Sequence, residues 1–270
     1  MLVIGERINA TRKAVKEALS SRDAAFIRGE AAAQAEAGAD YIDVNGGTSP
    51  AAERENMIWL VEEVQAAASL PLCLDSANAE VIEEGLKRHR NGRALVNSIS
   101  MEKGRHESVL PLVKEHGAQV VALALDDSGI PRGADDRLRV VAKIVEEVER
   151  AGIALSDVFI DPLVMALSAD QGAARLALEV VAGIKKRWPE LKTTCGLSNI
   201  SFGLPRRRLL NRTFLAMLMA FGLDSAIVDP LDEKLMAAVH AGRALCGLDE
   251  FCMGYIRAHR SGRLGPSSVK

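Results

Sequence analysis

Asp, Asn and Glu residues recur in this sequence at the ends of short apolar segments, where their side chains could bind a ligand. Carboxylates accept hydrogen bonds from adjacent N–H groups, and amides both donate and accept them. Such a set suits a neutral heterocycle better than a phosphate. The endings are GERIN (5–9), YIDVN (41–45), LCLDS (72–76), ALVNS (94–98), ALALDD (122–127), FIDP (159–162), GLSN (196–199) and AIVDP (226–230). The candidate residues are Glu6, Asn9, Asp43, Asn45, Asp75, Asn97, Asp161, Asn199 and Asp229.

The apolar segments alternate with segments of helical length, which is typical of an α/β protein with a parallel sheet. Strands are expected at 2–6, 40–45, 71–75, 93–98, 119–125, 157–161, 192–197 and 225–228. Helices are expected at 22–38, 51–68, 77–89, 105–116, 134–151, 171–187, 207–222 and 232–245. Such a rhythm over 270 residues predicts one (β/α)8 TIM barrel, in which the carboxyl ends of the strands form one mouth. We expect a single domain over 1–262 and a disordered tail over 263–270.

Composition argues against several other classes of protein. The net charge is −2 and aromatic residues make up only 4%, so no nucleic-acid partner is expected. No apolar run approaches the roughly 18 residues of a membrane span, and no signal peptide is evident, so no membrane partner is expected. The four cysteines form no CxxC pair, which favours a reduced, cytoplasmic location.

Asp75, Asn97 and Asp161 stand out by their local sequence. Asp75 directly follows a buried strand, and Ser76 or Asn78 could cap the next helix in its place. Asn is disfavoured within strands, so the position of Asn97 calls for another reason, such as a ligand. Asp161 begins an Asp-Pro sequence, which also commonly starts a turn, so a structural role is an equal alternative for it alone.

The segment 196–199 combines small residues with an amide. Gly196 and Ser198 would let the backbone approach a ligand closely, and Asn199 would present its side chain beside them. Ser and Asn residues also hydrogen-bond within their own turns, so a self-bonded turn is the alternative interpretation.

The first two strand endings also allow two interpretations. Glu6 could face a ligand, or it could pair with Arg7 inside the barrel, and Asn9 lies close by in the sequence. Asp43 and Asn45 are two residues apart, so both point to the same side of their strand. They could lie inside the barrel or at its mouth.

Other catalytic classes lack their motifs. The sequence has no GxSxG nucleophile elbow and no GxxxxGK[ST] phosphate loop. The histidines at positions 89, 106, 116, 240 and 259 fall in expected helices or in the C-terminal segment, so we expect them at the surface and expect no bound metal. Arg206, Arg207 and Arg208 lie at a helix start, where cations oppose the helix dipole. They form either a solvated helix start or a site for an acidic partner.

The chain resembles the pterin-binding methyltransferase family, whose members include methyltetrahydrofolate:corrinoid/iron–sulfur protein methyltransferases. The folate domain of cobalamin-dependent methionine synthase is related to this family. The resemblance covers about residues 1–262. The chain differs from the related dihydropteroate synthases, because it lacks their strand-seven lysine and Arg-x-His motifs. Phe202 stands where some corrinoid-linked members carry a polar amide. The matching segments are MLVIGERIN (1–9), LCLDS, ALVNS, FIDP, GLSNISFGLP (196–205) and LLNRTFLAMLMAFGLDSAI (209–227).

The resemblance implies roles for individual residues. Asp75, Asn97 and Asp161 would hydrogen-bond the pterin ring, as would the segment with Gly196 and Ser198. Asn199 would lie near N5, the atom that carries the methyl group, and would be the catalytic residue. Further candidates for substrate binding are Glu6, Asn9, Asp43, Asn45 and Arg207.

The implied reaction moves the N5-methyl group of methyltetrahydrofolate to the cobalt(I) of a corrinoid, a cobalamin carried by a partner protein. Tetrahydrofolate is the other product. Asn199 would donate a hydrogen bond that strengthens as the C–N bond breaks. The family resemblance also implies a homodimer. Two alternatives are a dihydropteroate synthase-like transferase and a folate-binding barrel without catalysis.

Overall fold

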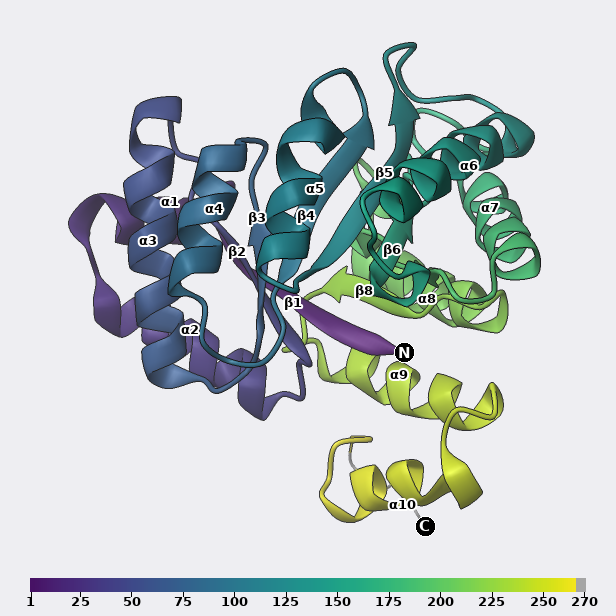
Figure 1. The fold of residues 1–270 in the computed structure, drawn as a ribbon. Coiled ribbons are helices and arrows are strands. Elements are labelled where there is room, and N and C mark those ends of the chain that lie inside the picture. The colour runs from purple at the N-terminus through teal and green to yellow at the C-terminus, as the bar shows by residue number, and fades with distance from the viewer. Residues whose placement is uncertain (266–270) are drawn as a thin grey trace.

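A computed structural model describes residues 1–265 and shows a (β/α)8 TIM barrel (Figure 1). This confirms the expected fold class. Its parallel strands follow the order β7-β6-β5-β4-β3-β2-β1-β8. The expected tail at 263–270 lies for the most part outside the described residues. The strands are β1 (Leu2–Asn9), β2 (Tyr41–Asn45), β3 (Leu72–Asp75), β4 (Leu95–Met101), β5 (Gln119–Asp126), β6 (Val158–Asp161), β7 (Lys192–Thr193) and β8 (Ser225–Val228).

Helices connect the strands and cover the outside of the barrel, and α10 lies beyond α9 at the bottom of Figure 1. The helices are α1 (Lys13–Ser21), α2 (Ala24–Glu36), α3 (Pro50–Ala67), α4 (Ala79–Arg88), α5 (Arg105–Glu115), α6 (Ala134–Arg150), α7 (Ala173–Arg187), α8 (Arg207–Ala220), α9 (Glu233–Leu245) and α10 (Met253–Arg260). Three 3-10 turns are η1 (Leu155–Asp157), η2 (Leu197–Ser201) and η3 (Glu250–Cys252). No helix within residues 1–265 is both long and apolar enough to span a membrane.

The first connection contains a helix that the sequence pattern did not predict. The expected helix at 22–38 is α2, and α1 precedes it at 13–21. Asp23 separates the two helices, because its side chain caps α2 by accepting the Phe26 backbone N–H at 3.0 Å. The C-cap residue of α1, Arg22, has a left-handed backbone with φ 53°, which turns the chain between them.

One buried cluster packs among the strands, and two larger ones pack between the strands and the helices. The first contains side chains from β1 to β6, including Ile4, Tyr41, Leu95 and Phe159. The Tyr41 hydroxyl in this cluster has a hydrogen-bond partner, because it donates to Gln119 Oε1 at 2.7 Å. These apolar side chains close the barrel below its mouth, as expected for doubly buried parallel strands.

The barrel is closed by irregular pairing on one side. β7 contains only two residues, so the expected strand at 192–197 was too long. Beyond it, Gly196 forms a single bridge with Ile227, whose N–H donates to the Cys195 carbonyl at 2.9 Å. On the other side of β8, residues 225–228 pair regularly with 2–5 of β1. Because β7 ends early, the chain can curl into η2 directly at the mouth.

The expectation of surface histidines is wrong for three of the five, since His106 is buried and His89 and His240 are half-buried. His106 is buried, because it lies on the same face of α5 as Val109, Leu110 and Val113, which pack against the barrel. His89 is half-buried and accepts the Leu72 backbone N–H through Nε2 at 3.2 Å. His89 and His106 therefore support the barrel wall rather than its mouth.

The inner cluster gives a direct test of the fold. Phe159 is fully buried, whereas the side chain of Phe251 is 85% exposed. We expect Phe159→Ala to lower the free energy of unfolding by about 3–5 kcal/mol, because the lost side chain leaves a cavity inside the barrel. Urea denaturation followed by circular dichroism measures this. Phe251→Ala is the matched control, with an expected change within about 0.5 kcal/mol. Equal effects of the two substitutions would contradict this packing.

Candidate active site

The structure brings the predicted residues to the carboxyl ends of the strands in two groups. The first group lies on β1–β4 and consists of Asn9, Asp43, Asn45, Asp75 and Asn97. The second lies around the ends of β6–β8 and consists of Glu6 from β1 with Asp161, Gly196, Ser198, Asn199, Arg207 and Asp229. Within residues 1–265, no group of three His, Cys, Asp or Glu side chains is arranged to hold a metal ion.

Asp75 is the centre of the first group. Its Oδ2 accepts hydrogen bonds from Asn45 Nδ2 at 3.0 Å and from Asn9 Nδ2 at 3.4 Å. Asn97 is its register partner on β4. Asn78, and not Asp75, caps α4 by accepting the Glu80 N–H at 2.9 Å. Asp75 is thus not needed as a helix cap, and burial raises the pKa of its carboxyl despite the bond from Asn45.

Asp43 lies deeper in the same group. Its side chain points to the same side of β2 as that of Asn45, is only 2% exposed, and has one carboxyl oxygen without a partner. Burial and the nearby Asp75 raise its pKa well above the ordinary value, while hydrogen bonds with Cys73 and Asn97 oppose the rise. Burial thus favours the protonated form of Asp43 beneath the mouth, and in that form its carboxyl can donate a hydrogen bond toward the mouth.

Asp161 anchors the second group. Its Oδ1 accepts the Leu163 N–H at 2.7 Å, which is the turn that its Asp-Pro sequence suggests. Burial raises its pKa to about 6, although backbone hydrogen bonds from Leu163 and Gly196 favour the charged form. One oxygen therefore stabilises the loop, and the carboxyl also contacts the segment that carries Asn199.

A buried arginine that the sequence analysis missed holds the loop after β6. Arg137 on α6 donates hydrogen bonds to the backbone carbonyls of Pro131 at 2.9 Å and of Leu163 at 2.7 Å, and also to that of Pro162. The helical period could have revealed it, because position 137 lies four residues before Val141 on the buried face of α6. Arg137 thus fixes the turn that orients Asp161.

Asn199 lies exposed on η2 and is positioned by small neighbours. A Cβ atom on Gly196 would lie 3.1 Å from Asn199 Nδ2, so a glycine leaves room for this side chain. Arg207 at the start of α8 braces the turn, donating to the Ser198 carbonyl at 2.8 Å and to Ser201 Oγ at 3.1 Å. The basic helix start is therefore partly a support for the Asn199 loop.

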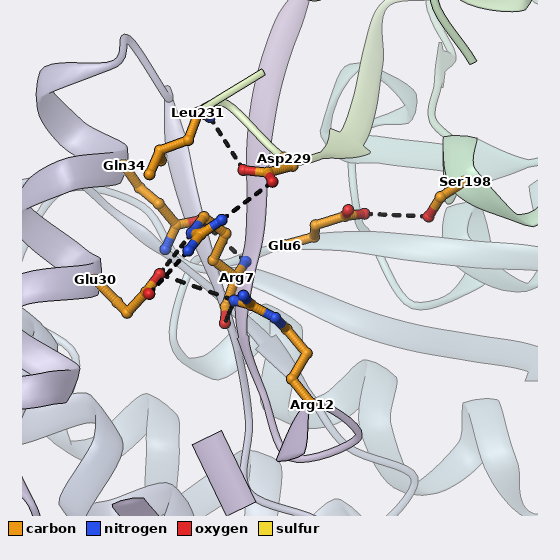
Figure 2. A network of polar contacts seen from close by, with 8 residues as sticks. All are labelled: Glu6, Arg7, Arg12, Glu30, Gln34, Ser198, Asp229 and Leu231. Carbon is orange, nitrogen blue, oxygen red and sulfur yellow. Dashed lines mark hydrogen bonds and ion pairs between the residues drawn. The ribbon is translucent and has the colours of Figure 1, made fainter. Parts of the chain in front are cut away.

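Glu6 faces an open cavity of about 320 Å³ between β1, β8, η2 and α8. Figure 2 shows that its carboxylate points toward Ser198, whose hydroxyl donates to Oε2 at 3.4 Å. The interpretation that Glu6 pairs with Arg7 is wrong, because Arg7 instead forms ion pairs with Glu30 at 2.6 Å and Asp229 at 3.1 Å. Burial, and then the charge of Asp229, raise the pKa of Glu6 to about 7.

The two groups together form a mouth of partly desolvated carboxyls and amides. A ligand with adjacent N–H donors would supply the hydrogen bonds that water does not make to these carboxylates. An anion would instead be repelled by several negative groups. The site therefore fits a polar, hydrogen-bonding ring better than a phosphate ester.

The raised pKa of Asp161 makes a prediction about stability. The folded protein holds this proton up to a pH of about 6, whereas an ordinary Asp releases it near 3.8. Its contribution to stability is thus complete below about pH 4 and is lost as the pH rises through 6. Asp161→Asn, which still accepts the Leu163 N–H, should gain about 1–3 kcal/mol relative to the unchanged protein between pH 4 and 7.

Urea denaturation at pH 4, 5, 6 and 7 measures this difference, and a difference that does not vary with pH would contradict it. Asp126→Asn is the control, because the pKa of Asp126 is shifted in the opposite direction. Hydrogen bonds from Lys143 and Ser128 lower the pKa of Asp126 to about 2, so this variant should not gain stability as the pH rises.

Comparison with solved structures finds the same fold in dihydropteroate synthases. The enzyme from Coxiella burnetii, solved with pteroic acid, has a TM-score of 0.68 and 15% identity over 92% of this chain and 94% of that chain. The enzyme from Xanthomonas albilineans, solved with 7,8-dihydropteroate, has a TM-score of 0.65 and 18% identity over 92% and 93%. At these identities the comparison supports the fold alone.

Sequence comparison finds nearer relatives. A methylcorrinoid:tetrahydrofolate methyltransferase from Eubacterium limosum is 39% identical over the full length of both chains. A methionine synthase from Mycobacterium tuberculosis is 35% identical over 84% of this chain. The matched region makes up only 20% of that longer protein. The sequence pattern of the family described as pterin binding enzyme matches residues 5–229. The chain therefore belongs to the pterin-binding enzyme family.

Proposed function

We propose that this protein is a methyltransferase that moves a methyl group between N5 of tetrahydrofolate and the cobalt of a corrinoid carried by a partner protein. The observation that carries the proposal is the 39% identity over the full chain with a methylcorrinoid:tetrahydrofolate methyltransferase. The polar mouth supports it, because its carboxyls and amides match the hydrogen-bonding edge of a pterin ring.

Asp75, Asn97 and Asp161 would hold the pterin ring. Two amides already bind Asp75 Oδ2, so Oδ1 is the oxygen that can accept from a ring N–H. Asp75 and Asp161 are both carboxyls with raised pKa values. A ligand that supplies N–H donors to them favours their charged forms, and this couples pterin binding to the loss of protons, near pH 6 in the case of Asp161.

Asn199 would act on N5. Its side chain is exposed, in close approach to Gly196, on a loop that Arg207 supports by a hydrogen bond to the Ser198 carbonyl. An amide cannot supply a proton through ionisation, but it can donate a hydrogen bond to N5 as the bond to the methyl group breaks. Binding of the ring by the two groups of the mouth would fix N5 and its methyl group for in-line transfer.

The corrinoid is a substrate that a second protein brings to the mouth. Phe202 lies three residues after Asn199, and its side chain is 67% exposed, so this side of the mouth presents an apolar group to an incoming partner. We infer a corrinoid protein as this partner and a homodimer as the assembled state, with a cytoplasmic location. The dihydropteroate synthase alternative is supported only by the shared fold at 15–18% identity.

The decisive experiment mixes the purified protein with methyltetrahydrofolate and reduced free cob(I)alamin without oxygen, while the cobalt spectrum is recorded. Protein-dependent formation of methylcobalamin is the expected result. A parallel assay with p-aminobenzoate and a pterin diphosphate tests the dihydropteroate synthase alternative. Calorimetric binding of methyltetrahydrofolate without transfer would favour a binding-only barrel, and no binding at all would overturn the proposal.

Two substitutions separate catalysis from binding. Asn199→Ala should lower kcat by about 10²–10³, because it removes a hydrogen bond that is strongest in the transition state, and should leave the Kd for methyltetrahydrofolate within about threefold. Asp75→Ala should instead raise that Kd by about 10- to 100-fold through the loss of a charged hydrogen bond. Rates from the cobalt spectrum and Kd values from calorimetry measure both effects.

Asn91→Ala is the control, since Asn91 binds the Ala68 carbonyl in the connection before β4, at the opposite end of the barrel. It should change neither quantity. Full transfer rates in Asn199→Ala would show that this residue does not act on N5.

A further inference from the structure

The cavity beside the Asn199 loop contains one carboxyl without an ionic partner among the described residues that line it. Three carboxylic residues line the cavity: Glu6, Asp229 and Asp232. Asp229 pairs with Arg7 at 3.1 Å, and Asp232 pairs with Arg212 at 2.6 Å. Glu6 has only the long hydrogen bond from the Ser198 hydroxyl at 3.4 Å, and its side chain is largely shielded from solvent.

The proposed reaction can use such a group. When tetrahydrofolate takes the methyl group, the N5 lone pair forms the new C–N bond and the methyl–cobalt bond breaks. The electron pair of that bond stays on cobalt as cobalt(I), and the N5–H proton must leave. The reverse reaction returns one proton to N5. Each transfer thus releases or takes up one proton, and a group near N5 that titrates near neutral pH would assist this step as a general base or acid.

We propose that Glu6 exchanges the N5 proton with solvent, acting through the hydroxyl of Ser198 at the edge of the cavity. This inference rests on the proposed function. Ser198 directly precedes Asn199, and a hydroxyl can accept one proton while donating another. The proton therefore passes from N5 to Ser198 Oγ as the Ser198 proton passes to the Glu6 carboxylate, and the open cavity connects Glu6 to solvent.

The other acids of the mouth suit this task less well. Asp75 and Asp161 are bound by amides or backbone N–H groups and are assigned to the pterin ring. Asp43 is buried beneath the ring and does not line the cavity. Asn199 has no ionisable proton, and the described histidines lie on helices or helix ends away from the strand ends.

The surroundings of Glu6 poise it for exchange. Asp229 on the β8 side and burial favour its protonated form. Ser198 of η2, Arg12 before α1 and Arg207 of α8 favour its charged form. Asp232 before α9 and Arg208 of α8 line the same cavity with opposite charges. Asp43 of β2 also lies near Glu6, with its own pKa raised by burial. The balance places the pKa of Glu6 at about 7.

The test follows kcat from pH 5.5 to 9 in both directions, with methylcobalamin plus tetrahydrofolate and with cob(I)alamin plus methyltetrahydrofolate. Methylation of tetrahydrofolate needs charged Glu6, so its rate should rise through pH 7. The reverse reaction needs protonated Glu6, so its rate should fall through the same pH. Glu6→Gln should abolish both inflections and lower kcat by about 10²–10⁴, with KM for the folate within threefold.

Ser198→Ala and Asp229→Asn sharpen the test. Ser198→Ala should lower kcat without adding to the effect of Glu6→Gln, because both interrupt one path. Asp229→Asn removes the charge that raises the pKa of Glu6, so it should keep the inflection and move it to lower pH. An infrared carboxyl signal that titrates near pH 7 in the unchanged protein and is lost in Glu6→Gln reports the same group without turnover.

Thermal melting of Glu6→Gln within a few degrees of the unchanged protein shows that the variant is folded. If the unchanged protein transfers methyl groups and Glu6→Gln retains both inflections and full rates, the role of Glu6 is overturned while the proposed function stands. If the unchanged protein neither binds folate nor transfers methyl groups, both proposals fail together.

Discussion

Removal of carboxyl groups from water is the constraint on which this mouth depends. For Glu6, Asp43, Asp75 and Asp161, burial is the largest cause of a raised pKa. A parallel barrel with an apolar interior gives the strand ends little water, so each carboxyl needs hydrogen-bond donors from its neighbours. The amides of Asn9 and Asn45 and the N–H of Leu163 supply part of them. The carboxyl oxygens that these donors leave without a partner can accept hydrogen bonds from a ligand.

The two sides of the mouth are built differently, and the difference suits their tasks. Asp75 and Asn97 are paired in register on the adjacent strands β3 and β4, which fixes their positions to a precision useful for holding a rigid ring. Asn199 projects from a short 3-10 turn that is supported by Arg207 and by the close approach of Gly196. A loop can adjust as the substrate changes charge and geometry, whereas a strand end cannot.

The fold and the first group of the mouth could be predicted from sequence, because strand periodicity and polar strand endings are local signals. Asp75, Asn97 and Asp161 all lie where their segments indicated. The early end of β7, the pairing of Arg7 with Asp229 and the carbonyl partners of Arg137 could not be read this way. They depend on contacts between residues far apart in the chain, which no local pattern specifies. α1 was missed because its short amphipathic segment directly precedes the longer, Ala-rich segment of α2.

The pairing of β1 with β8 has a consequence for how the chain acquires its structure. Residues 2–5 are synthesised long before residues 225–228, and one of the two edges of β1 finds its partner only when residues 225–228 have been made. Until then β1 presents an unpaired edge, the kind of surface on which nascent chains aggregate. Its closure is a contact of very high sequence separation and therefore slow. The cavity of Glu6 lies on this seam, so it is assembled last, and newly made protein must complete its barrel before that cavity exists.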